Sequence, residues 1–81
     1  MAASVSLNKD LALELIETNL AVVRKDIRRI LSRWQVKSSQ EMIEMTEKGE
    51  LREAEVDALA LTNLIDKEKE LEGLHAFVDE A

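Results

Sequence analysis

Apolar residues recur at alternating steps of three and four between residues 13 and 34: Leu13, Ile16, Leu20, Val23, Ile27, Ile30 and Trp34. This spacing predicts a helix that packs one face along another helix, and no Pro or Gly interrupts it. A seven-residue repeat drifts slowly around a straight helix, so keeping it on one partner requires a gentle left-handed supercoil. We therefore predict a core seam along this stretch and a bundle or coiled-coil architecture.

Capping signals divide the remaining chain. Ser38 and Glu41 have the spacing of a capping box, in which the hydroxyl accepts the Glu41 N–H and the carboxylate accepts the Ser38 N–H. Gly49 can adopt the left-handed conformation that ends a helix. Residues 1–6 are small or polar, and we expect them to be disordered. The resulting prediction is three helices at about residues 7–35, 38–48 and 50–78.

The third predicted helix has an apolar stripe that changes side. Leu51, Ala54, Ala58, Leu61 and Ile65 form its first part, and we assign Leu61 and Ile65 to the core seam. Beyond Ile65 the apolar edge passes to Leu64, Leu71, Leu74 and Val78. We predict one all-α domain over residues 1–81, an antiparallel hairpin of two long helices with a short connecting helix.

The size of the chain favours self-association. A domain of 81 residues buries only about 60% of its unfolded surface, so a single core is marginal. The absence of Cys excludes disulfides, and one His excludes a structural zinc site within one chain. Leu11, Leu15 and Val22 lie on the back of the first helix, away from the seam. We predict that they form an interface and that two chains associate as a homodimeric four-helix bundle.

The net charge of −6 is distributed unevenly. Residues 1–37 carry seven basic and four acidic residues, whereas residues 38–81 carry four basic and thirteen acidic residues. The acidic half suggests an alternative, an inhibitor or antitoxin-like protein that covers a basic partner. No apolar run is long enough for a membrane span, and no signal peptide is indicated. We therefore expect a cytoplasmic protein that has no membrane partner.

A basic stretch, Arg24 to Lys37, occupies the outer side of the first helix. A basic helix near an aromatic residue can contact nucleic acid, but the acidic balance of the chain argues against a nucleic-acid partner. A phosphorylated or acidic protein partner is a further alternative. We expect these charges to be compensated by carboxylates of the second and third helices, namely Glu44, Glu47, Glu50 and Glu53.

Glu72 and His75 form a Glu-x-x-His pair, a spacing used by di-iron bundles. A homodimer would supply two such pairs, and Glu14 or Glu17 on the first helix is predicted to lie roughly opposite. A solvated acidic face is the favoured interpretation, and a metal-binding four-helix bundle remains an alternative. Glutamates occur at every third position from Glu41 to Glu53, and helical pyrophosphohydrolases hold magnesium with clustered carboxylates. However, this period rotates around a helix, so these carboxylates cannot converge on one ion.

No motif selects a particular protein family, and no nucleophile turn or catalytic histidine constellation is present. We predict a non-enzymatic protein–protein interaction module without a cofactor, in which the principal partner is a second copy of the chain.

Overall fold

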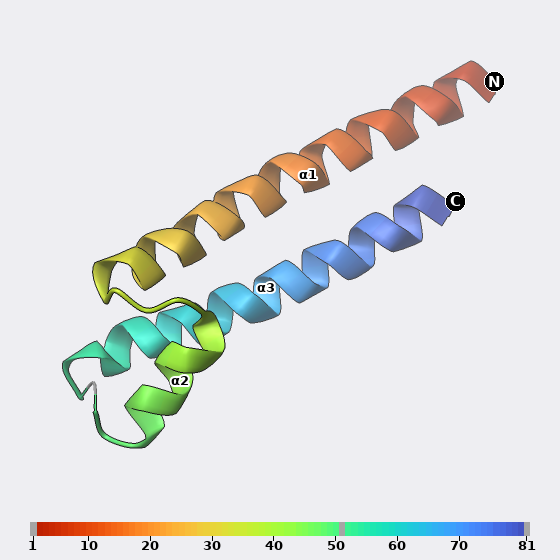
Figure 1. Cartoon of the computed structure of the whole chain (residues 1–81). Coiled ribbons are helices and arrows are strands. Elements are labelled where there is room, and N and C mark those ends of the chain that lie inside the picture. The colour runs from red at the N-terminus through yellow and green to blue at the C-terminus, as the bar shows by residue number, and fades with distance from the viewer. Residues whose placement is uncertain (1, 51, 81) are drawn as a thin grey trace.

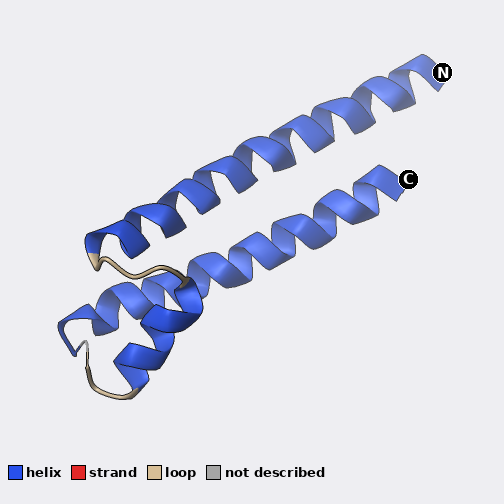
Figure 2. Ribbon diagram, viewed as in Figure 1, coloured by secondary structure: helices blue, strands red, loops and turns tan. Residues whose placement is uncertain are grey.

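Three α-helices and a short 3₁₀ helix make up the computed structural model, which describes residues 2–50 and 52–80 (Figure 1). They are α1 (Ala2–Arg33), α2 (Ser39–Glu47), η1 (Arg52–Ala54) and α3 (Glu55–Glu80). No strand occurs within these two ranges, which confirms the predicted all-α class (Figure 2). The molecule is a rod of 57 × 18 × 17 Å.

The long helices α1 and α3 run antiparallel, and the two chain ends lie at the same end of the rod (Figure 1). The short helix α2 packs beside them only at the opposite end. We call residues 8–22 and 69–80 the open half, where only α1 and α3 are present. Residues 23–68 form the loop half, which has three helices in cross-section. A long helix pair with a short connecting helix was the predicted arrangement.

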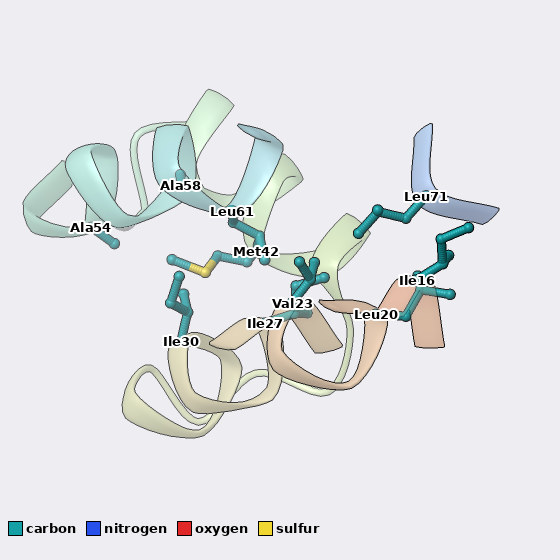
Figure 3. Close-up of a cluster of buried hydrophobic side chains, with 10 residues drawn as sticks. All are labelled: Ile16, Leu20, Val23, Ile27, Ile30, Met42, Ala54, Ala58, Leu61 and Leu71. Atoms are coloured by element: carbon teal, nitrogen blue, oxygen red, sulfur yellow. The ribbon is translucent and has the colours of Figure 1, made fainter. Parts of the chain in front are cut away.

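The buried residues form one core along the α1–α3 contact: Ile16, Leu20, Val23, Ile27, Ile30, Met42, Ala54, Ala58, Leu61 and Leu71. Met42 and Leu61 are fully buried in the loop half, and Leu71 faces Ile16 and Leu20 in the open half (Figure 3). Of the other predicted seam residues, Trp34 and Ile65 are partly buried against this core, and Leu13 is partly buried near its end.

Both ends of the connection between α1 and α2 are capped. Gln35 adopts a left-handed conformation with φ of 54°, and the Val36 N–H donates to the Leu31 carbonyl at 3.1 Å. This Schellman geometry ends α1 at Arg33, two residues before the predicted end, although no glycine marks the position. The side chains of Val36 and Leu31 both pack against the core, which supplies the apolar contact that accompanies the motif.

The N-terminal cap of α2 differs in one detail from the predicted capping box. The Ser38 hydroxyl accepts the Glu41 N–H at 3.1 Å, as expected. The Glu41 carboxylate, however, accepts the N–H of Lys37 at 3.0 Å rather than that of Ser38. At the other end of α2, Gly49 has φ of 78°, and the Glu50 N–H donates to the Met45 carbonyl at 2.9 Å. This second Schellman motif ends the helix where the glycine predicted.

The start of α1 also differs from the sequence prediction. Helix α1 begins at Ala2, whereas residues 1–6 were expected to be disordered, and Met1 lies outside the described residues. Residues 2–6 contain neither Gly nor Pro and include Ala2 and Ala3, so a helix that is already nucleated further along can propagate through them. The third predicted helix begins as η1 at Arg52 and continues in α3 to Glu80.

Candidate interaction surface

The charged contacts that Glu17 and Arg24 make with α3 mark one side of the hairpin. Arg24 donates to Glu68 at 3.0 Å and to Glu72 at 3.2 Å. Nearer the open end, Glu17 lies 3.1 Å from His75. On helical projections, Glu17, Arg24 and Glu72 all lie about 70–90° to one side of the seam of their helix. We call this flank the ion-pair side.

In the open half, the exposed apolar residues lie on the opposite flank. The loop half has two more on α3, Val56 and Leu59, which are 79% and 65% exposed. Leu15 and Val22 on α1 are 58% and 54% exposed, and Leu74 and Phe77 on α3 are 47% and 73% exposed. On the same projections they lie about 80–140° from the seam, in the sense opposite to the ion-pair side. Leu11, 53% exposed, lies further round on α1. These five residues form what we call the apolar side of the open half.

The apolar side has no covering helix among the described elements. Helix α2 packs in the loop half, where it forms a groove with α3 that is lined by Ile43, Thr46, Glu55, Ala58 and Thr62. Ala58 belongs to the same flank of α3 as Glu72, because the two are fourteen residues, or two heptads, apart. Helix α2 therefore lies on the ion-pair side and leaves the other flank open along the rod.

The predicted interface residues Leu11, Leu15 and Val22 thus lie on one exposed surface. The structure adds Leu74 and Phe77, which the sequence analysis did not assign to an interface. The sequence predicts Leu74 as part of an apolar edge of the third helix and makes no assignment for Phe77. A signal was present, because Leu74 and Phe77 are spaced by three on a stretch of helix where Leu71 and Val78 already supply the residues that pack on the core. Their flank is defined only once the ion pairs fix how α3 faces α1.

Compensation of the basic stretch involves other carboxylates than those predicted. Within the described part of the chain, Arg24 pairs with Glu68 and Glu72, and Arg33 pairs with Asp57 at 2.9 Å. Arg29 pairs with Asp26 on its own helix. Glu44, Glu47, Glu50 and Glu53 take part in none of these ion pairs. The reason is geometric, since α3 begins at Glu55 and its residues, not those of α2, run level with the basic stretch.

At the loop end, Asp57 connects α3 to the end of α1. Its Oδ2 accepts hydrogen bonds from the Trp34 indole N–H at 2.7 Å and from the Arg33 guanidinium at 2.9 Å. The indole hydrogen bond, followed by the charge of Arg33, holds the pKa of the Asp57 carboxyl below its ordinary value, although partial burial acts in the opposite direction. The indole of a partly buried Trp therefore has its hydrogen-bond partner in the structure.

We expect Asp57→Asn to reduce stability at neutral pH but not in acid. Because folding lowers the pKa of Asp57, its ionic stabilisation is complete above the unfolded-state pKa of about 3.9 and is lost as the pH falls through the folded-state pKa. Thermal melts of the parent and the variant from pH 7 down to about pH 2 test this. The difference in melting temperature should shrink below about pH 4. A difference that stays constant over the whole range would contradict the assignment.

The candidate metal ligands Glu17, Glu72 and His75 do not form a cluster of metal ligands. Glu17 and His75 do meet, and Glu72 lies in the same surface depression as both. However, the Arg24 guanidinium also lines this depression and is hydrogen-bonded to Glu72, so a cation already faces that carboxylate. No group of three or more His, Asp or Glu side chains suited to a metal ion occurs among the residues described. Within one chain, these residues form a surface network of hydrogen bonds and ion pairs.

None of the helices in the described ranges is long and apolar enough to cross a membrane. Comparisons of the chain with protein-family models, with curated proteins and with solved structures found no match. The candidate surface must therefore be interpreted from its own chemistry.

Proposed function

We propose that the protein is a non-enzymatic helical interaction module that self-associates through the apolar side of its open half, giving a dimer with four helices in cross-section. The observation that carries this proposal is the exposure of five large apolar residues on one flank of a two-helix rod: Leu11, Leu15, Val22, Leu74 and Phe77. Contiguous apolar patches of this kind are typical of contact surfaces in small proteins.

The size of the patch supports a specific interface. Half-exposed Leu, Val and Phe side chains each present on the order of 100 Å², so the five residues offer about 500 Å² per copy. Two copies would then bury about 1,000 Å² before any flanking polar residue is counted, which is the lower limit for specific interfaces. This supports a dimer of moderate affinity.

The architecture of the open half gives a reason for such contact. In the loop half, α2 covers the α1–α3 seam, and the fully buried Met42 fills the space between the helices. In the open half, Leu71 on α3 is buried against only one helix, and the adjacent Leu74 and Phe77 remain exposed. Two helices alone make a marginal core, and a second copy provides the missing layer.

Light scattering behind gel filtration tests the proposal. The chain has a mass of 9.2 kDa, so we expect a species of twice that mass at tens of micromolar, with dissociation on dilution. A monomeric mass at that concentration would reject self-association. The apolar side would then be interpreted as a docking site for a different protein.

A further inference from the structure

We propose that the two copies overlap through their open halves and point in opposite directions, so that α1 lies against α1, α3 lies against α3, and the loop halves project from the two ends. This inference rests on the proposed self-association and specifies its geometry. The principal alternative is a bundle in which both loop halves lie at the same end and α1 of each copy faces α3 of the other. The positions of the apolar residues distinguish the two arrangements.

The register of α1 against α3 follows from their side-chain contacts. The residue numbers of the pairs Glu17–His75, Arg24–Glu68 and Arg33–Asp57 sum to 92, 92 and 90, and those of Arg24–Glu72 sum to 96. A residue on α1 is therefore level with the residue on α3 whose number completes a sum of about 92. This relation gives each exposed apolar residue of the open half, on either helix, a position along the rod axis.

The apolar residues are arranged symmetrically on that scale. Leu11 and Val22 are equally distant from the midpoint between Ile16 and Glu17, and Leu74 and Phe77 are equally distant from the midpoint between His75 and Ala76. The Glu17–His75 contact places these two midpoints at the same level of the rod. The patch therefore has a single centre that both helices share.

One two-fold axis through that centre, perpendicular to the rod, matches the patch to itself. It places Leu11 of one copy opposite Val22 of the other, places Leu74 opposite Phe77, and brings the two Leu15 side chains together near the axis. An isologous interface requires self-complementarity of this kind. This symmetry is also the reason to choose a second copy over an unrelated helix as the occupant.

The same-end arrangement matches fewer of these residues. It would place Leu15 opposite Phe77, but Val22 would face Glu70 and Leu74 would face Thr18, because α1 then meets α3 of the other copy at equal levels. It would also cover the loop half of this flank, which carries Asp26, Arg29 and Lys67 as well as the exposed Val56. Burying charges is unfavourable even where, as for Asp26 and Arg29, they pair with each other. The overlapping arrangement leaves Lys67 in water and places Asp26 and Arg29 level with residues 7 and 4 of the other copy's α1.

Cysteine cross-linking tests the orientation, because the chain contains no cysteine of its own. Asn19 and Asn63 are both exposed and lie on the apolar flank, one in the open half and one in the loop half, so Asn19→Cys and Asn63→Cys are matched variants. In the overlapping dimer, the two thiols introduced at position 19 are about 8 Å apart along the rod, and the two introduced at position 63 are about 38 Å apart. In the same-end dimer, both pairs of thiols lie at equal levels.

Each variant is purified, checked for parent-like helix content and mass, and treated with a short bismaleimide at tens of micromolar. We expect a cross-linked dimer from Asn19→Cys and at least about tenfold less from Asn63→Cys. Comparable cross-linking of both variants would overturn the orientation while leaving the dimer intact. A dimeric mass without cross-linking of Asn19→Cys would place the interface elsewhere. A monomeric mass for the parent and both variants would reject self-association itself.

Discussion

Ile27→Asp should abolish the folded hairpin. Ile27 lies in the middle of the α1 seam, is only 9% exposed and belongs to the core that α1 shares with α3 and Met42. An aspartate at this position would place a charge without an arranged partner among apolar side chains, at a cost of several kcal/mol. A small domain has only about 5–15 kcal/mol of stability in total, so we expect loss of the cooperative thermal transition seen by circular dichroism.

Ala21→Asp provides the matched control for this variant. Ala21 is exposed on the same helix and lies off the seam, so the substitution adds the same charge without burial and loses more helix propensity than Ile27→Asp does. The control should melt within a few degrees of the parent. If Ile27→Asp kept a cooperative transition close to that of the control, the seam would be assigned to the wrong face of α1.

The parts of the fold that depend on local pattern could be predicted from the sequence. The seam from Ile16 to Ile30 follows from steps of three and four, and the central residues of that seam are buried. The cap at Ser38 and the left-handed Gly49 could likewise be predicted, because the chemistry of each is contained within a few residues. The all-helical class follows from these signals together.

The end of α1 could not be located from the residues next to it in the sequence. Gln35 adopts a left-handed conformation that is usually taken by glycine or asparagine. A glutamine at this position therefore does not predict a Schellman motif. The motif is stabilised instead by the burial of Val36 and Leu31 against the core. A tertiary contact therefore determines a local conformation, and propensity alone could not have located it.

The charged partners and the full extent of the apolar side depend on the register between helices distant in sequence. Asp57 was not singled out in the sequence, yet it accepts hydrogen bonds from both Trp34 and Arg33. Its role depends on the length of the connection that brings the start of α3 beside the end of α1. For the same reason Leu74 and Phe77 could not be grouped with Leu15 until Arg24 and Glu72 fixed the facing of α3.

A hairpin with a complete core at one end and two helices at the other has different stability along its length. The loop half contains the fully buried Met42, Ala54 and Leu61, whereas in the open half Ile16, Leu20 and Leu71 are 6–8% exposed and Val78 is only partly buried. Segments with few buried contacts open most readily. Dimerisation through the open half would therefore stabilise the part of the molecule that needs it most.

Leu15→Glu combined with Val22→Glu should convert the dimer to a monomer while leaving the hairpin folded. Both side chains are more than half exposed and point away from the α3 seam, so the isolated chain loses little burial. In the proposed dimer, however, each Val22 faces Leu11 and the two Leu15 side chains meet at the axis. The substitutions would place four carboxylates in one interface, and we expect association to weaken by on the order of 100-fold, about 2.7 kcal/mol.

Val56→Glu combined with Asn63→Glu is the control that separates position from charge. Both residues are exposed in the loop half of α3, outside the proposed overlap, and the pair adds the same two negative charges. Light scattering across a dilution series should give the control the mass of the parent and give Leu15→Glu/Val22→Glu the mass of a monomer. That monomer should retain its far-ultraviolet helical signal but melt at a lower temperature, because the stabilisation linked to association is lost. Equal masses for the two double variants would show that the apolar side of the open half is not the surface that joins the copies.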